Sequence, residues 1–200
     1  MNTYAIIIVA ALLAEYLLGI VSNVLNLRHL RPTPPAELSD IYDEEEYRRS
    51  QEYTRTRTRF GFVTSTVDLA VLLIFWFAGG FEWLDTLVRG FGWNPVWTGL
   101  SFVGIVGGAN AVLSLPFSVY STFVIEERFG FNESSVRTFV MDLLKGAGLS
   151  IVIGGPILAA VLAFFTYTGP YAWIYAWLLV TVVMLVLQYL APQYIMPLFN

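Results

Sequence analysis

Few side chains in this 200-residue chain could take part in chemistry, and the most informative are polar residues inside long apolar stretches. Glu15, Asp68 and Asn110 are such residues. An acidic side chain at the centre of a bilayer costs at least about 2.5 to 3.5 kcal/mol on insertion scales, so it needs a polar partner or water. Two interpretations stand side by side: a buried or interfacial hydrogen-bonded residue, or a residue that lines a hydrated cavity between helices.

The spacing around these residues favours a polar helix face. Gly19, Ser22 and Asn26 follow Glu15 at intervals of four, three and four residues, which places all four on one stripe of a helix. Asp68 lies about 12 Å along the axis of the second apolar stretch at 1.5 Å per residue. We therefore take Glu15, Asn26, Asp68 and Asn110 as the candidate lining of a cavity.

The chain offers little to a metal ion. It has no Cys and one His, His29, whereas a structural zinc site commonly takes four ligands that are mostly Cys and His. His29 falls at the edge of the first apolar stretch, where a solvated or structural role is expected. We predict no catalytic, metal-binding or cofactor-binding residue within this chain.

Composition identifies the solvent that these residues must avoid. Hydrophobic residues make up 56% of the chain and charged residues 13%, with a mean hydropathy of +0.65. A soluble domain carries about 25% charged residues, so lipid must cover much of this surface. The absence of Cys and the 16% of aromatic residues exclude a disulfide scaffold and disorder, and nothing resembles a nucleic-acid-binding surface.

The fold class predicted is an all-α membrane protein with five transmembrane helices and one or two cytoplasmic helical segments. A span needs about 20 mostly apolar residues. The chain offers five such stretches, which together form a single transmembrane domain over 1–200, at about 3–27, 60–81, 96–125, 147–168 and 171–191. The turn Thr168-Gly169-Pro170 should join the last two as a helical hairpin.

Lys and Arg set the orientation, because cytoplasmic loops carry an excess of them. Of the eleven cations, only Arg89 falls between the second and third spans, and the other ten fall in the segments after the first and third. This distribution predicts an integral, multi-pass protein with its N-terminus outside and its C-terminus at Asn200 in the cytoplasm. The external segment, 82–95, is rich in Trp and Phe, as expected of rings in the headgroup layer.

Helix starts and packing faces can also be predicted. Thr33 as N-cap and Pro34 as first helical residue favour a helix over 36–59 that continues into the second span. Asn132 as N-cap favours another from Glu133 to about Lys145, after a break at Gly130. Small residues give close helix packing in lipid. They recur at Gly104 and Gly108, and at Gly155, Ala159 and Ala163.

Three strings carry a family resemblance: Phe-Val-Ile-Glu-Glu-Arg-Phe-Gly-Phe-Asn over 123–132, Thr-Phe-Val-Met-Asp-Leu-Leu-Lys over 138–145, and Pro-Gln-Tyr-Ile-Met-Pro-Leu-Phe-Asn over 192–200. With Arg-Ser-x-x-Tyr at 49–53 and the number of spans, they resemble the N-terminal half of the CAAX prenyl endoproteases. These are integral membrane zinc metalloproteases of the gluzincin type. Glu126, Arg128, Gly130 and Asn132 match the family motif, and we expect them to be structural supports of the cytoplasmic mouth.

The resemblance implies a helical bundle around a large hydrated chamber, closed at its cytoplasmic end by a protease domain that removes three C-terminal residues from prenylated proteins. In such enzymes a His-Glu-x-x-His helix binds zinc, which activates a water molecule. This chain lacks that motif. We expect the protease domain and its zinc after Asn200, with this chain forming the chamber walls and the route for substrate and being inactive alone.

Two alternatives belong to other classes. The chain could be a stand-alone membrane scaffold or conduit that keeps the bundle without the protease. A secondary transporter would need inverted repeats, which five spans cannot supply evenly. In each case the lipid bilayer is the first partner, and a prenylated protein or peptide is the substrate expected only of a full-length protease.

Overall fold

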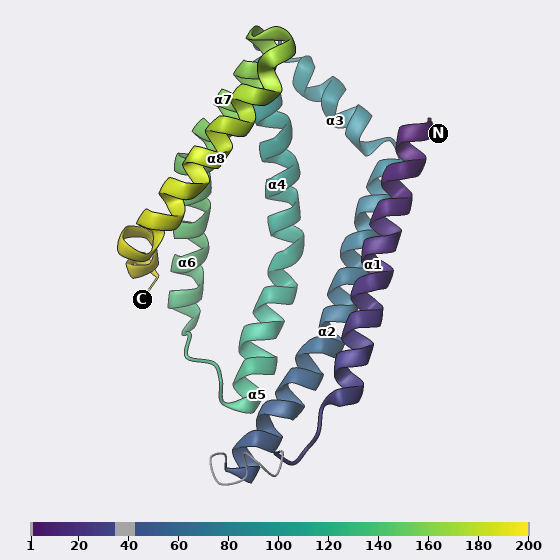
Figure 1. Ribbon diagram of the computed structural model, residues 1–200, viewed down its shortest axis with the longest axis vertical. Coiled ribbons are helices and arrows are strands. Elements are labelled where there is room, and N and C mark those ends of the chain that lie inside the picture. The colour runs from purple at the N-terminus through teal and green to yellow at the C-terminus, as the bar shows by residue number, and fades with distance from the viewer. Residues whose placement is uncertain (1, 35–42, 200) are drawn as a thin grey trace. The chain divides into compact units, whose positions relative to one another are not determined.

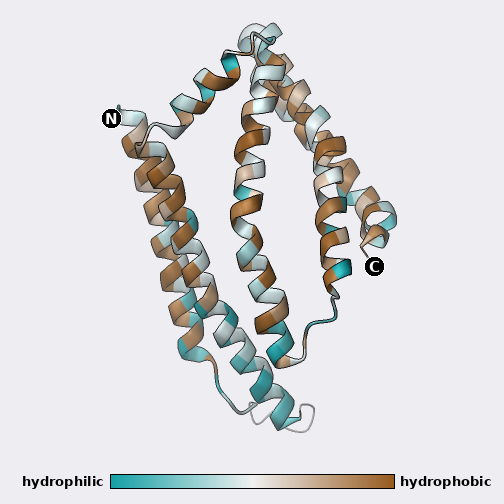
Figure 2. Ribbon diagram, turned by 180° about the vertical axis from the view of Figure 1, so that it is seen from behind, coloured by the Kyte–Doolittle hydropathy of each residue, from teal (hydrophilic) through white to brown (hydrophobic). Residues whose placement is uncertain are grey.

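The computed structural model describes residues 2–34 and 43–199, and every regular element in these ranges is a helix. Five helical runs are long and apolar enough to cross a membrane, which confirms the predicted fold class. Figure 2 shows the apolar residues running along these helices. The runs are Thr3–His29, Glu44–Phe77, Pro95–Phe129, Val136–Tyr167 and Gly169–Leu198.

The chain forms two compact units. The first comprises Met1–Phe81 with Leu113–Asn132, and the second comprises Glu82–Val112 with Glu133–Asn200. The boundary falls inside the helix α4 (Pro95–Tyr120), which contributes its first part to the second unit and its last part to the first.

In the first unit, helices α1 (Thr3–His29) and α2 (Glu44–Phe77) lie side by side (Figure 1). The side chain of Asn2 accepts a hydrogen bond from the Ala5 amide at 2.8 Å and caps α1. The Tyr16 hydroxyl and the Thr66 hydroxyl are 2.7 Å apart and bridge the two helices. This bond satisfies two polar groups that would otherwise face lipid.

Helix α2 begins later than the sequence suggested. Pro34, predicted as its first residue, is not helical, and the predicted stretch 35–42 lies outside the described residues. The described helix begins at Glu44, because the Asp43 carboxyl accepts a hydrogen bond from the Glu46 amide at 2.9 Å. Acidic residues in the first turn suit the positive end of the helix dipole.

A short helix that the sequence analysis did not predict follows α2. Gly79 has a φ of 77°, which only glycine adopts readily, and this turn separates α2 from α3 (Gly80–Arg89). Helix α3 buries Leu84 and Val88 on one face. The Asp85 carboxyl accepts a hydrogen bond from Arg89 at 2.7 Å, and this bond raises the pKa of the arginine. The external segment 82–95, predicted to place its rings in the headgroup layer, therefore contains most of an amphipathic helix.

The third span does not end at Tyr120. A π-helical segment, η2 (Ser121–Glu126), and the short α5 (Glu127–Phe129) extend it. Gly130 then adopts a left-handed conformation with φ of 73°, and the Phe131 amide donates to the Glu126 carbonyl at 2.9 Å. The predicted break at Gly130 is confirmed, and its cause is the left-handed turn.

The predicted N-cap of the next helix is wrong. Helix α6 (Val136–Leu149) begins after Ser135, whose hydroxyl accepts a hydrogen bond from the Thr138 amide at 3.1 Å. Asn132 lies three residues before this cap, and its side-chain amide donates to the Glu127 carboxyl at 2.9 Å. A π-helical segment, η3 (Ser150–Gly154), joins α6 to α7 (Gly155–Tyr167) without a break.

The predicted hairpin between the last two spans is confirmed. Gly169, with φ of 63°, opens the one-turn η4 (Gly169–Tyr171), and α8 (Ala172–Leu190) packs against α7. The short helices η5 (Ala191–Ile195) and η6 (Met196–Leu198) follow. The Lys145 ammonium donates to the Leu198 carbonyl at 2.6 Å and to Asp142 at 3.1 Å, which ties this end to α6.

A close helix approach in the second unit occurs at Gly99. A Cβ built on Gly99 would lie 2.8 Å from the Leu162 side chain of α7. A Cβ on Gly104 or Gly155, two glycines of the predicted packing stripes, would meet nothing within 4 Å. Gly99 is therefore a glycine of α4 at which a missing side chain leaves room for Leu162 of α7.

We predict that Gly99→Val lowers the free energy of unfolding by about 1 to 3 kcal/mol relative to Gly104→Val, because overpacking forces neighbours out of place. The second variant is the matched control, since its Cβ enters open space on the same helix. Thermal unfolding of both proteins in detergent measures the difference. Equal stabilities would show that Gly99 is not a packing contact.

Candidate functional site

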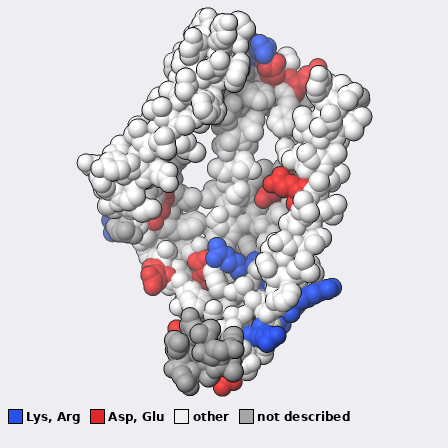
Figure 3. Space-filling model, in the orientation of Figure 1, with Lys and Arg blue, Asp and Glu red and all other residues white. Residues whose placement is uncertain are grey.

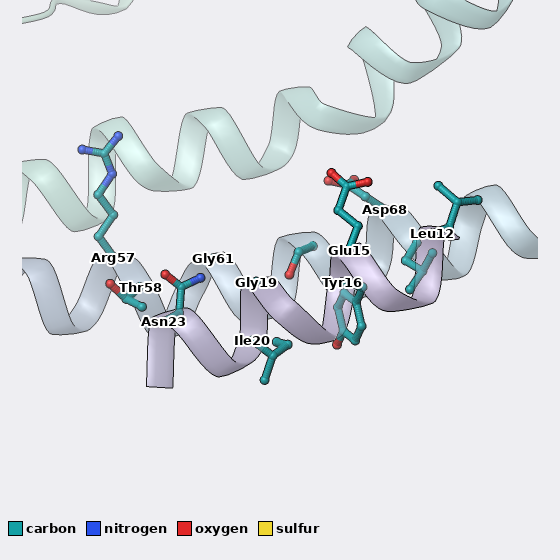
Figure 4. A pocket seen from close by; sticks show the side chains of 12 residues that line it. Leu12, Glu15, Tyr16, Gly19, Ile20, Asn23, Arg57, Thr58, Gly61 and Asp68 are labelled. Carbon is teal, nitrogen blue, oxygen red and sulfur yellow. The ribbon is translucent and has the colours of Figure 1, made fainter. Parts of the chain in front are cut away.

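The candidate site is a cavity of about 580 Å³ between α1 and α2 in the first unit, lined by charged and polar residues together with Leu12, Ile20 and Leu69 (Figure 4). Helix α1 contributes Glu15, Tyr16, Gly19 and Asn23. Helix α2 contributes Arg57, Thr58, Gly61, Ser65 and Asp68. A cavity lined by acidic, basic and neutral polar groups inside two apolar helices can hold water or a polar ligand, whereas lipid chains would leave these groups unsatisfied.

Helix periodicity explains why α2 presents these residues together. Arg57 and Asp68 are eleven residues apart, which is about three turns of an α-helix. Gly61 and Ser65 lie between them on the same face. In Figure 4, Arg57 and Asn23 lie at one end of the cavity, and Glu15 and Asp68 lie at the other.

A second cavity of about 320 Å³ lies between α2 and the last part of α4. It shares Arg57, Gly61 and Asp68 with the first cavity. Its other polar lining consists of Thr64, Ser114, Ser118 and Ser121. One face of α2 therefore serves both cavities, and the acidic and basic residues on it reach each of them.

The charged residues of the cavity make no ion pair within the described part of the chain, where the ion pairs are Arg48–Glu45, Arg89–Asp85 and Lys145–Asp142. Arg57 instead donates to the Tyr53 hydroxyl at 3.1 Å, and its guanidinium lies 5.9 Å from the centre of that ring. In Figure 3 most of the visible surface carries no charge, so the few charged groups are set apart from broad uncharged stretches.

Two of the four residues predicted to line a cavity lie in the same one. Glu15 and Asp68 both line the α1–α2 cavity. Asn26, on the same helix as Glu15, lines neither cavity, and Asn110 belongs to the second unit and lines neither. Asn23 takes the place expected of Asn26: Asn26 is on nearly the same face as Glu15, but the lining of the cavity on α1 ends at Asn23, one turn earlier.

Arg57 is the functional candidate that sequence reasoning missed. In the sequence Arg57 is one of the cations that follow the first span, and these predict orientation rather than a site. The spacing of eleven residues to Asp68 is the signal that could have identified it, since that interval returns a helix to nearly the same face.

The residues of the Glu126–Asn132 motif pack against the first part of α2. The Tyr53 ring lies 5.7 Å from Phe129 and 4.9 Å from Phe131, and the Arg49 guanidinium lies 5.6 Å from the Phe131 ring. Arg128 lies 5.6 Å from the Phe129 ring. These contacts join Arg49 and Tyr53 of one motif to the Phe-Gly-Phe turn of the other.

The described residues do not fit a zinc centre. They contain no group of three His, Cys, Asp or Glu side chains close enough to hold a metal ion. The Nδ1 atom of His29 is 2.7 Å from the Leu25 carbonyl of its own helix.

Five apolar helices and a polar cavity define this chain as an all-α, integral, multi-pass membrane protein. Residues 23–200 match the family described as the CAAX prenyl protease N-terminal domain, with five membrane helices. The chain belongs to this family, as the resemblance in its sequence indicated.

Individual relatives agree with this assignment. The chain is 34% identical to CAAX prenyl protease 1 homolog of Arabidopsis thaliana, over 90% of this chain and 45% of the relative. It is 35% identical to the probable CAAX prenyl protease 1 of Schizosaccharomyces pombe, over 85% of this chain and 39% of the relative. The crystal structure of S. mikatae Ste24p matches all of this chain and 48% of that chain, with a TM-score of 0.88 and 29% identity. The chain thus spans about half the length of the relatives that it matches.

Cysteine labelling tests whether the cavity holds water. The chain has no native Cys, so each introduced thiol is reported alone. We predict that Glu15→Cys and Asp68→Cys react with a membrane-impermeant thiol reagent in the folded protein, because the thiolate forms only in contact with water. Leu18→Cys is the matched control: Leu18 is 70% exposed on α1 but lies outside the cavity, where lipid protects it. If none of the three cysteines reacted with the reagent, the result would favour the interpretation that Glu15 and Asp68 are packed away from water.

Proposed function

We propose that this chain is the membrane portion of a zinc metalloendopeptidase that processes the C-terminus of prenylated (CAAX) proteins. Its own residues form walls of a hydrated chamber and a route for substrate, and the bond is cleaved elsewhere in the protein. The observation that carries the proposal is the family match over residues 23–200, combined with polar cavities in apolar helices.

The proposed roles of α1 and α2 follow from their two surroundings, which are lipid on the outer surface and the cavity between them. Apolar side chains of α1 and α2 meet lipid, while Glu15, Asn23, Arg57 and Asp68 keep a polar cavity open. A prenylated protein has a lipid chain and a polar peptide. The apolar surface of the helices suits the lipid chain, and the cavity with its polar groups suits the peptide. Asn26 and Asn110, predicted from sequence as further lining, line neither of these two cavities.

The proposal places the zinc-protease domain after Asn200. Among the described residues no three His, Cys, Asp or Glu side chains lie close enough to hold a metal ion, and the proposal assigns them neither a zinc ligand nor a general base. Its contribution is to hold the substrate and to position the segments next to the catalytic domain. We assign Glu126, Arg128, Gly130 and Asn132 to this positioning, which the contacts of the Phe-Gly-Phe turn with Arg49 and Tyr53 support.

The mass and metal content of the natural gene product test this proposal. A product much heavier than 22.4 kDa that holds about one zinc ion and cleaves a farnesylated CAAX peptide is the expected result. Intact mass spectrometry, zinc analysis and the cleavage assay are made on one preparation. A metal-free product of 22.4 kDa would contradict the proposal and favour a scaffold.

We also propose that the N-terminus lies outside and the C-terminus in the cytoplasm, where prenylated substrates occur. The excess of Lys and Arg in the segments after the first and third spans supports this orientation. A reporter that is active only in the cytoplasm, fused after Phe199, should be active, and the same reporter fused before Thr3 should be silent. The reverse pattern would overturn the orientation.

A further inference from the structure

The α1–α2 cavity separates its charges, and this separation is not needed merely to keep a cavity wet. Glu15 and Asp68 lie at one end, and Arg57 lies at the other (Figure 4). On α2 the interval of eleven residues from Arg57 to Asp68 corresponds to about 16 Å along the axis at 1.5 Å per residue. At that distance Arg57 cannot neutralise the acidic pair by direct contact.

The middle of the cavity is neutral and open. Ser65 supplies a hydroxyl group there and Thr58 supplies another beside Arg57, while Gly19 and Gly61 supply backbone without a side chain. A Cβ built on Gly19 or Gly61 would meet nothing within 4 Å. Helix packing therefore does not require glycine at these two positions. The absence of side chains there instead enlarges the cavity.

A complementary occupant has a cation at one end, an anion at the other and hydrogen-bonding groups between them. An extended peptide with free ends has these properties, since its amide groups can bond to the hydroxyls between the charges. At about 3.3 to 3.6 Å per residue, a separation of about 16 Å corresponds to about five residues.

We propose that the α1–α2 cavity is a binding site for short peptides of about five residues with free termini. The α-ammonium group binds between Glu15 and Asp68, and the α-carboxylate binds Arg57. This site goes beyond the proteolysis proposed above, because the three-residue product expected of a CAAX substrate is too short to reach both charged ends at once.

Equilibrium binding of an alanine–serine pentapeptide with free ends, tritiated and recovered intact, tests the site. The full-length natural protein is placed in phosphatidylcholine nanodiscs. We expect the pentapeptide to bind at least about tenfold more tightly than its C-terminal amide or its N-acetyl form, as the loss of one charge-assisted hydrogen bond predicts. An alanine–serine tripeptide should be weaker by a similar factor. Equal affinities for the free and blocked pentapeptides would overturn the proposal.

Variants paired with blocked peptides assign each end. Arg57→Gln should weaken binding of the free pentapeptide about tenfold but leave binding of its C-terminal amide unchanged, because the two changes remove the same contact. Glu15→Gln with Asp68→Asn should show the same relation to the N-acetyl peptide. Arg55→Gln, a neighbouring arginine that lines neither cavity, is the matched control and should bind like the unmodified protein. If the loss of affinity from a variant and the loss from the matching blocked peptide were additive, the two would not share a contact, and the assignment would be contradicted.

Filling the cavity gives a test that does not depend on charge. Gly61→Leu should fold, because its Cβ enters open space, and should abolish pentapeptide binding. Thermal unfolding verifies that this variant is folded. Unchanged binding in a folded Gly61→Leu protein would place the peptide elsewhere and overturn the proposal.

Lipid composition separates a peptide site from a lipid site. The pentapeptide should bind equally in phosphatidylcholine and phosphatidylglycerol nanodiscs. If the pentapeptide bound in phosphatidylglycerol nanodiscs but not in phosphatidylcholine nanodiscs, the zwitterionic headgroup of phosphatidylcholine would be the occupant of the cavity. That result would refute the peptide assignment. Cleavage of a farnesylated CAAX peptide, measured on the same protein, reports on the proteolytic function separately, so the two proposals can fail independently.

Discussion

The constraint on which this structure depends is that a polar side chain within the bilayer must find a polar neighbour or water. Glu15 and Asp68 each lie inside a stretch that must cross the membrane, where exposure to lipid costs at least about 2.5 kcal/mol per residue. The pairing of α1 with α2 meets this constraint by turning both side chains into one cavity. The Tyr16–Thr66 hydrogen bond between the same helices satisfies two further polar groups.

The same pairing creates the distribution of charge that makes the cavity specific. Because Arg57, Gly61, Ser65 and Asp68 recur on one face of α2, the cavity extends along the helix and has different charges at its two ends. The face also serves the cavity beside α4, whose serines are neutral. A ligand in this region would therefore meet its strongest electrostatic discrimination along the axis of α2, between Arg57 and the acidic pair.

Outside these cavities, the first unit is held at its polar end by aromatic and cationic contacts. The left-handed Gly130 turns the chain so that Phe129 and Phe131 both reach Tyr53, and Arg49 lies over Phe131. A residue with a Cβ at position 130 would disfavour this turn, because φ of 73° is costly for residues other than glycine. The two family motifs are thus parts of one contact, although some 80 residues separate them in the sequence.

The sequence by itself determined the class of the fold, the five spans, the hairpin at Gly169, the break at Gly130 and the family. These depend on hydrophobic length, on glycine and proline, and on specific strings, all of which are local. Only the tertiary structure decided which residues share a cavity. Asn23 rather than Asn26, and Arg57 from a run of arginines, line it because the cavity between α1 and α2 reaches only as far as these two residues. The start of α6 was likewise decided by the tertiary structure: both Asn132 and Ser135 are residue types that cap helices, and the chain becomes helical only after Ser135.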